Sequence, residues 1–331
     1  MEIQGTPPSF IERYFKVREK GTTIRTELLA GVTTFIAMAY ILFVNPNILA
    51  DAGIPKDAAI ASTIWIAAIA SLAMGAFANY PVALAPGMGL NAFFAYYVCG
   101  VLGLHWTVAL GAVFFSGVLF LILTVGGIRQ AIINAVPRDL KLAISTGIGL
   151  FIAFIGLKGT GLIVENAATY VALGHVTSPT TLLSLFGLLF TAALMARNVH
   201  GAILIGIFVT TILAMAFGMT PAPQGFGDIV STSLPHMGDT FGKLDLAGAW
   251  NYGLVSIIFT FTVVELFDNM GTLIGLTTKA KMVKSDGRIE NIDKALTTDA
   301  VGTMVSAVFG TSTVTSYIES AAGIAAGGRT G

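Results

Sequence analysis

The sequence has few charged residues and almost no cysteine. Only 11% of its 331 residues are Asp, Glu, Lys or Arg, compared with about 25% in ordinary globular domains. Hydrophobic residues make up 55% of the chain and its mean hydropathy is +0.81. These values exclude a soluble globular protein and predict an all-α, polytopic membrane protein. Cys99 is the only cysteine, so we expect neither an internal disulfide nor a cysteine-based metal site. A net charge of zero gives no sign of a nucleic-acid partner.

Sequence signatures of cofactor sites and of enzymes are also missing. The four histidines fall in expected loops or at span ends and lack metal-ligand spacing, so no metal site is expected. They are His105, His175, His200 and His236. Gly87-Met88-Gly89-Leu90 lacks the Lys-Ser/Thr ending of a phosphate-binding loop. It also lacks the Asp of the Gly-x-Gly-Asp element expected in an intramembrane aspartyl protease. We therefore expect no cofactor and no enzyme activity.

Apolar runs divide the chain into about ten expected membrane spans, since a spanning helix needs about 20 apolar residues. Arg197-Asn198-Val199-His200 separates the sixth span from the seventh. With the N-terminus in the cytoplasm, fifteen of the eighteen Lys and Arg residues fall on the inside, as the positive-inside rule requires. The expected spans are 28–49, 57–79, 82–100, 104–127, 140–157, 180–197, 199–217, 249–275, 295–310 and 313–328.

The first 27 residues are polar and charged, which argues against a cleavable signal peptide. Within them, apolar and basic residues alternate, and this pattern predicts a short amphipathic helix on the cytoplasmic membrane surface. The apolar residues are Phe10, Ile11, Tyr14, Phe15 and Val17, and the basic residues are Arg13, Lys16, Arg18 and Lys20.

Two of the expected spans are unsuited to a plain helix. The third opens with PVALAPGMGLNAFFAY (81–96), which is rich in Pro and Gly, and the tenth with GTSTVTSYIESAAGIAAGG (310–328), which favours extended structure. We expect each to begin extended and to turn into a half-helix near Asn91 and near Glu319. If the second half of the chain starts at residue 249, both are third spans of their halves, as in an inverted repeat. Such paired interruptions point to a transporter's binding site.

Three carboxylates are expected to lie well inside the spans: Glu265, Asp268 and Glu319. A carboxylate at the bilayer centre costs about 2.5–3.5 kcal/mol, so such residues usually face a cavity, pair or titrate. Asp268 and Glu319 are the stronger candidates, because Glu319 lies where the tenth span becomes helical and the free amides there favour an acceptor-bearing ligand. Two carboxylates accept hydrogen bonds, which suggests a ligand rich in N–H donors, such as a purine base.

Other polar residues in the spans have two interpretations each. Glu265, Asp268 and Thr272 are spaced i, i+3, i+7 and can share one helix face. Glu265 is the weaker functional candidate, either a tether between helices or a partner for a basic residue. Asn91 either caps its half-helix or contacts the ligand. Thr34 either lines the cavity or bonds back to its own helix, and we favour the second interpretation.

Four long stretches resemble the purine permeases of the AzgA-like group. This group belongs to the nucleobase–cation symporter-2 (nucleobase–ascorbate transporter) family, and the resemblance covers essentially the whole chain. The stretches are GVTTFIAMAYILFVNP (31–46), ALAPGMGLNAFFAY (83–96), ELFDNMGTLIG (265–275) and GTSTVTSYIESAAGIAAGGRTG (310–331).

The resemblance implies an inverted 7+7 repeat in which spans 3 and 10 are broken strand–helix segments. Residues 28–127 (spans 1–4) would form the first part of a core domain, and 249–331 (spans 8–10) its second part. Residues 128–217 (spans 5–7) would form a gate domain, and 218–248 an extracellular loop. Family members continue for about a hundred further residues after the motif at 310–331, so the remainder of the second repeat is expected to be absent.

The resemblance also implies uptake of adenine, guanine or hypoxanthine by proton symport across the cell membrane. The implied partners are the purine, a proton, the lipid bilayer and a second copy in a homodimer. Uracil and xanthine permeases often have a His where this chain has Thr272, which puts a His-assisted proton relay in doubt. The alternatives are an anion or other solute transporter of the same fold, and a fragment that does not transport. The resemblance places the family's substrate-binding positions at Asp268, Glu319 and Asn91. Taken with the residue patterns above, the expected substrate-binding residues are Asp268, Glu319, Asn91, Gly89 and Ile318, the proton-coupling residues are Asp268, Glu319 and Glu265, and the supporting residues are Thr272 and Thr34.

Overall fold

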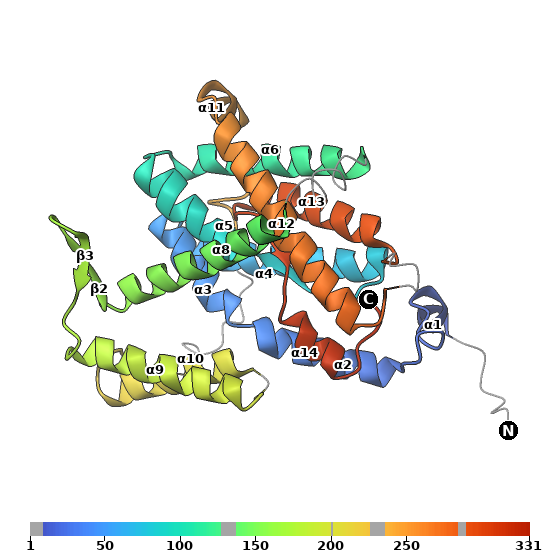
Figure 1. The fold of residues 1–331 in the computed structure, drawn as a ribbon, viewed down its shortest axis with the longest axis horizontal. Coiled ribbons are helices and arrows are strands. Elements are labelled where there is room, and N and C mark those ends of the chain that lie inside the picture. The colour runs from blue at the N-terminus through green and yellow to red at the C-terminus, as the bar shows by residue number, and fades with distance from the viewer. Residues whose placement is uncertain (1–8, 127–136, 200, 226–235, 284–288) are drawn as a thin grey trace.

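The structure is a computed structural model that describes residues 9–126, 137–199, 201–225, 236–283 and 289–331. Parts of the expected N-terminal segment, gate domain and extracellular loop lie outside these ranges. His200 also lies outside them. Most of the described chain is helical (Figure 1).

The described helices are α1 (Phe10–Tyr14), α2 (Ile24–Met38), α3 (Ile41–Asp51), α4 (Lys56–Ala73), α5 (Met88–Ala92), α6 (Trp106–Val125), α8 (Arg138–Gly159), α9 (Pro179–Ala196), α10 (Ala202–Ala216), α11 (Leu246–Asn251), α12 (Val255–Lys279), α13 (Ile292–Phe309) and α14 (Ser320–Ala325). Two π-helical segments, η1 (Met74–Ala78) and η2 (Phe93–Val101), continue α4 and α5. The short strands are β1 (Leu84–Pro86), β2 (Ile163–Asn166), β3 (Tyr170–Leu173) and β4 (Val314–Ser316).

Five helical stretches in the described residues are long and apolar enough to cross a membrane. Three shorter apolar helices accompany them, within α5–η2, α8 and α10. Large apolar side chains such as Leu72, Val125 and Leu189 face outward on the spanning helices, as lipid contact requires. The five stretches are Ile24–Asp51, Lys56–Ala78, Trp106–Val125, Pro179–Ala196 and Val255–Lys279.

Two expected spans are interrupted. The first expected span, 28–49, consists of two helices, α2 and α3, which meet at Ala39 and Tyr40. Pro46, which has no N–H to donate to the carbonyl of Leu42, lies just beyond this break. The eighth was expected to be continuous over 249–275, and this is wrong, because α11 ends at Asn251 and α12 begins only at Val255. Gly253 has a φ of +63° between them.

The broken third and tenth spans cross each other through a pair of antiparallel strands. Leu84 of β1 pairs with Ser316 of β4, and Pro86 pairs with Val314. The Gly87 N–H donates to the carbonyl of Thr313 at 2.9 Å, which extends the ladder by one bond. Each strand leads into a helix, β1 into α5 and β4 into α14. The expected strand–helix form of both spans is confirmed.

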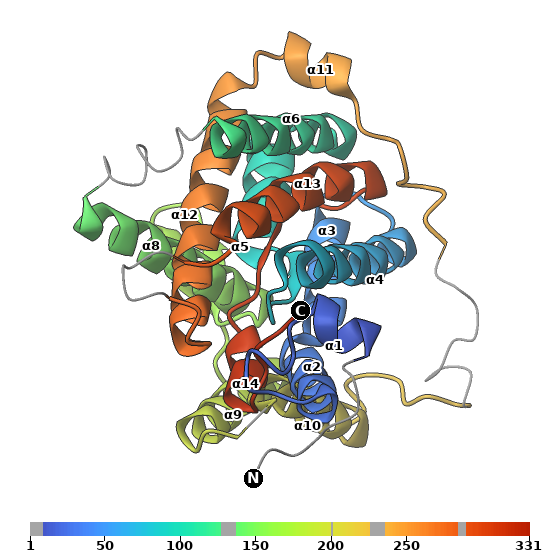
Figure 2. The same ribbon diagram turned by 90° about the vertical axis from the view of Figure 1, so that its right-hand side faces the viewer.

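Around this crossing, α6 packs closely on α13, and α4 covers another side of α13 (Figure 2). Gly117 of α6 allows the close approach: a Cβ at this position would lie 2.8 Å from Cγ of Met304 and 3.0 Å from its backbone nitrogen. Helices α9 and α10 form a separate pair, away from the α6–α12–α13 group (Figure 1). A β2–β3 hairpin joins α8 to α9 and was not expected in an all-α chain.

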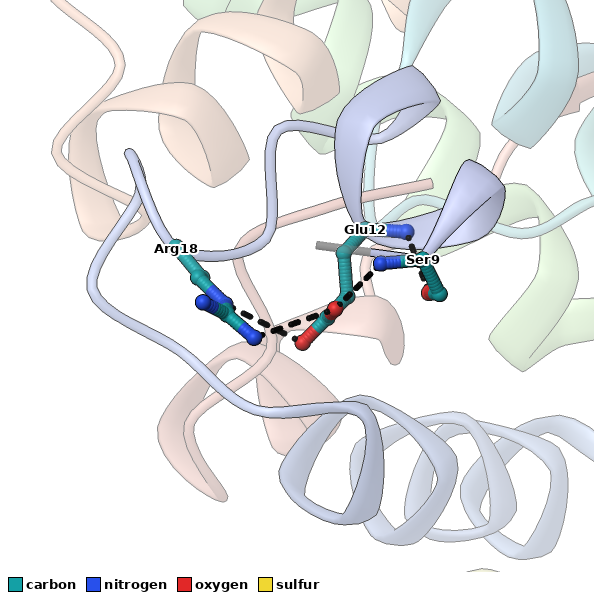
Figure 3. A network of polar contacts seen from close by, with 3 residues as sticks. All are labelled: Ser9, Glu12 and Arg18. Carbon is teal, nitrogen blue, oxygen red and sulfur yellow. Dashed lines mark hydrogen bonds and ion pairs between the residues drawn. The ribbon is translucent and has the colours of Figure 1, made fainter. Parts of the chain in front are cut away.

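The N-terminal helix is shorter than the alternating pattern over residues 10–20 predicts. α1 ends at Tyr14, and Lys16 has a left-handed φ of +56°. Ser9 and Glu12 form a capping box, and Arg18 reaches back to Glu12 at 3.3 Å (Figure 3). The hydrogen bond from the Ser9 backbone N–H and the nearby Arg18 guanidinium lower the pKa of Glu12. Its position on the cytoplasmic surface stays a prediction.

Hydrogen bonds fasten this segment to two distant parts of the chain. Asn79, which ends the second expected span, donates to the carbonyl of Phe15 at 2.9 Å. The Lys20 ammonium reaches the carbonyls of Asn79 and Arg329 at 3.4 and 3.3 Å, and its partial burial lowers the pKa of Lys20. The Glu27 carboxylate accepts from the backbone N–H of Arg329 at 2.9 Å. The N-terminal segment is thereby tied to the end of the second expected span and to the residues that follow α14.

Gly117→Ala tests the α6–α13 contact. The added Cβ must push against the backbone of Met304, so we expect the free energy of unfolding to fall by about 1–3 kcal/mol. Gly156→Ala in α8 is the matched control, because nothing lies within 4 Å of that position; we expect it to be neutral or to gain up to about 1 kcal/mol of helix propensity. Thermal unfolding of both variants in detergent measures the difference. Equal melting temperatures would contradict the close contact.

Candidate functional site

The candidate site lies where α12 passes the paired strands, because α12 packs against both β4 and α14. Asp268 is on α12, and its Oδ2 accepts a hydrogen bond from Thr315 Oγ1 of β4 at 3.4 Å. Glu319 occupies the N-cap position of α14, and its Oε1 accepts from the Tyr40 hydroxyl at 2.5 Å. Both carboxylate residues are partly exposed. The structure therefore places both stronger candidates next to one strand crossing.

One half-helix begins where the sequence pattern predicts, and the other begins three residues earlier. α14 begins at Ser320, directly after Glu319, as expected. α5 begins at Met88 with Gly87 as its N-cap, three residues before the expected position near Asn91. Gly89 lies in the first turn of α5 and is partly exposed, whereas Ile318, just before Glu319, is 56% exposed.

Asn91 lies inside α5 and is fully buried, so the interpretation of Asn91 as a capping residue is wrong. Its Nδ2 donates to Oδ1 of Asn45 in α3. Asn45 in turn donates to Thr63 Oγ1 at 2.8 Å and to Thr311 Oγ1 at 3.3 Å. Asn91 Oδ1 has no hydrogen-bond partner among the described residues. This network joins three helices to the segment before β4, and the Asn-Pro-Asn sequence at 45–47 was the available signal.

Glu265 is fully buried between α12 and α13. One of its carboxylate oxygens accepts from the Thr303 hydroxyl of α13, and the other has no partner within the described part of the chain. No salt bridge to a basic residue is found for Glu265 in the described ranges. The contact with Thr303 is therefore a tether between helices, one of the two roles that the sequence left open.

A fourth carboxylate, Asp299, was missed by counting only three inside the spans. It lies in α13, is fully buried, and neither of its oxygens has a hydrogen-bond partner among the residues described. Asn269 of α12 is also fully buried, and neither its Oδ1 nor its Nδ2 has a hydrogen-bond partner in the described structure. A buried carboxylate is costly to keep ionised without a partner. Asp299 is the fifth residue of the expected span 295–310, so its position alone could have indicated it.

The two supporting threonines lie on either side of this region. Thr272 is partly exposed, one turn after Asp268 on α12. Thr34 is 8% exposed and faces α14, where a Cβ on Gly323 would collide with its hydroxyl. Thr34 thus packs against a neighbouring helix, and whether it also lines a ligand cavity stays a prediction.

A cavity of about 600 Å³ lies beside α2 and α4 rather than at the strand crossing. Its walls are mostly apolar, and they include Thr34, Met38, Ala67 and Val82. Glu27 lines it, but none of the four intramembrane carboxylates Glu265, Asp268, Asp299 and Glu319 does. We therefore locate the candidate site by its converging polar groups, not by this cavity.

Comparison with known proteins assigns the chain to a family. The model of the Permease family, which is that of the xanthine and uracil permeases, matches residues 25–331. The chain belongs to this permease family. A membrane transporter rather than an enzyme is thereby confirmed.

Within the permease family, adenine permease AdeP of Escherichia coli K12 is 46% identical over 328 residues, which are 99% of this chain and 73% of that protein. Guanine/hypoxanthine permease PbuO of Bacillus subtilis is 43% identical over 323 residues, 96% of this chain and 73% of that protein. Among solved structures, the transmembrane domain of the cyanobacterium bicarbonate transporter BicA aligns with a TM-score of 0.62 at 16% identity, covering 93% of this chain and 78% of that one. A polytopic helical transporter fold is confirmed, while the 7+7 repeat and the ten spans stay predictions.

Gly87→Ala tests the strand crossing of this permease family member. Its Cβ would lie 2.9 Å from Cγ2 of Thr315, so we expect β1 and β4 to separate and the free energy of unfolding to fall by about 1–3 kcal/mol. Adding Thr315→Ser removes that methyl group and keeps the hydroxyl that bonds Asp268. The double variant should recover most of the loss in a detergent melting assay, with Thr315→Ser alone as control. A double variant no more stable than Gly87→Ala would refute the assigned contact.

Proposed function

We propose that this chain transports purine nucleobases across the cell membrane, with adenine, guanine and hypoxanthine as the candidate substrates, by proton symport. One observation carries the proposal: two partly accessible carboxylates, one on α12 and one at the start of α14, lie beside the crossing of two broken spans. The chain that holds them is 46% and 43% identical to an adenine and a guanine/hypoxanthine permease. The likeness to the bicarbonate transporter, at 16% identity, concerns the fold alone and does not favour an anion.

The acceptor chemistry of the site supports a purine. Asp268 and Glu319 each use one oxygen for a hydroxyl donor of the protein, which leaves acceptor capacity on the other oxygen. The N–H groups of a purine ring and its exocyclic amine match such acceptors. The backbone at Gly89 and Ile318 borders the same crossing and would contribute further polar contacts. Asn91 is too buried to be a primary contact, so we assign it the support of α5.

Proton coupling is supported by the gradient of burial among the carboxylates. Asp268 is partly exposed, whereas Glu265, one turn away on the same helix, and Asp299 are fully buried with unpaired oxygens in the described structure. A proton bound on one of these groups removes the cost of an unpaired charge. We propose that Glu265 and Asp299 hold the coupled proton behind Asp268, and that Asp268 or Glu319 senses the substrate.

Alternating access would move the core domain against the gate domain. Helix α8, in the proposed gate part, packs against α5 and α12 and so borders the strand crossing (Figure 1). A ligand at the crossing would therefore lie between the two domains, where rocking exposes it first to one side and then to the other. The inverted 7+7 repeat and a cytoplasmic N-terminus belong to this proposal.

The substrate assignment is tested by uptake of radiolabelled adenine, guanine, hypoxanthine and uracil in a host lacking purine permeases. We expect uptake of at least one purine, competed by the other purines more strongly than by uracil. Asp268→Asn and Glu319→Gln keep the side-chain size and remove an ionised acceptor, so each should reduce uptake by tenfold or more, the scale of a lost hydrogen bond to a charged group. Surface expression of every variant is the control. Unchanged uptake in both variants would sink the site assignment.

Proton coupling makes a separate prediction. Collapse of the proton gradient should abolish accumulation of the purine but leave exchange of internal for external purine. Asp299→Asn, which imitates a permanently protonated carboxylate, should do the same in cells with an intact gradient. Accumulation as high in Asp299→Asn as in the wild type would remove Asp299 from the coupling path. Uptake that never exceeds the external purine concentration, and that is unchanged when the gradient is collapsed, would indicate facilitated transport instead.

A further inference from the structure

Tyr40 is the residue whose hydroxyl contacts the Glu319 carboxylate. It lies at the break between α2 and α3, is only 3% exposed, and donates to Glu319 Oε1 at 2.5 Å. Within the described part of the chain, this is the hydrogen bond that the Glu319 side chain accepts. The two residues are 279 positions apart in sequence, so no local pattern could have paired them.

The backbone on both sides of Tyr40 is anchored by apolar packing. Its neighbours Met38 and Ile41 are buried and pack with Ala85 and Tyr317 in one apolar cluster. Tyr317 in turn donates to the carbonyl of Pro86 at 2.5 Å, which holds the backbone two residues before Glu319. The backbone leading to Glu319 is therefore held by one tyrosine and its carboxylate by the other. A glutamate restrained in this way loses little further conformational freedom when it binds a ligand.

We propose that Tyr40 is a positioning residue for ligand binding, which holds Oε1 of Glu319 so that Oε2 is presented to an N–H donor of the substrate. The inference rests on the proposed function, because Glu319 is the assigned contact. A hydroxyl donating to a carboxylate makes a strong, directional bond that selects one side-chain orientation. Tyr40 acts through Glu319 and does not itself touch the substrate.

A merely structural role for Tyr40 makes a different prediction. The bond also ties the first expected span to α14, so its loss could simply loosen the fold. In that case Tyr40→Phe would weaken binding whatever residue stands at position 319. A positioning role requires the weakening to depend on the glutamate, and a double-mutant cycle separates the two.

The experiment measures the Kd for tritiated adenine and hypoxanthine on purified full-chain protein: wild type, Tyr40→Phe, Glu319→Gln and the double variant. Tyr40→Phe should raise the Kd about tenfold, the size of one hydrogen bond to a charged group. The double variant should bind no more weakly than Glu319→Gln alone. Tyr96→Phe is the matched control, since it removes a 2.8 Å tyrosine–carboxylate bond to Asp51 outside the candidate site; its Kd should stay at the wild-type value.

Each failure has a distinct meaning. A wild-type protein that binds neither adenine nor hypoxanthine, and no guanine in the same assay, overturns the proposed function. Wild-type binding together with an unchanged Kd in Tyr40→Phe overturns the role of Tyr40, as does an equal loss in the Glu319→Gln background. If Tyr40→Phe does not fold, Glu319→Asp withdraws the carboxylate from Tyr40 by one methylene and keeps its charge. Unweakened binding by Glu319→Asp would then overturn the inference.

Discussion

The antiparallel pairing of β1 with β4 is the constraint on which the rest of this structure depends. Extended backbone cannot face lipid, because each unsatisfied N–H or C=O would cost several kcal/mol. The two strands satisfy each other across the fold, and the Gly87 and Tyr317 N–H groups extend the ladder at both ends. This pairing requires the helices that contact the two strands, α3, α4, α12 and α13, to enclose the crossing. It also brings segments about 230 residues apart into one place, where a site built from both becomes possible.

Glycines allow the helices around the crossing to pack closely. This close packing limits how the acidic side chains between the helices can be satisfied. Gly117 lets α13 approach α6, and Gly323 lets α14 approach Thr34 of α2. Helices this close leave little room for water, so a buried acid such as Asp299 must be satisfied by protein groups or by a proton. The partly exposed Asp268 and Glu319 lie at the margin of the same packing. The depth of each carboxylate thus follows from how tightly the surrounding helices fit.

Sequence patterns predicted the features that depend on composition or on local order. Five of the apolar runs form span-length helices, α9 and α10 are separate helices on either side of the predicted break at 197–200, and spans 3 and 10 have strand–helix character. Sequence patterns could not predict contacts between distant segments, such as Tyr40 with Glu319 or Asn45 with Asn91. Sequence patterns also locate helix ends only approximately: capping was one of two roles open to Asn91, and it is excluded because Gly87 is the N-cap of α5. Asp299 was predictable from its place in an apolar run and was overlooked.

The partners of the intramembrane carboxylates bear on what those carboxylates can do. Thr303 contacts Glu265, Thr315 contacts Asp268 and Tyr40 contacts Glu319, and all three donors are neutral hydroxyls. No salt bridge to these acids is found in the described residues. Arg18 and Glu12 form an ion pair, but they lie in the N-terminal segment. An Arg or Lys partner would hold a carboxylate permanently ionised. A hydroxyl instead can donate to the ionised form or accept from the protonated one, so each acid stays free to gain a proton or an N–H donor. A transporter that couples the two needs acids of this kind.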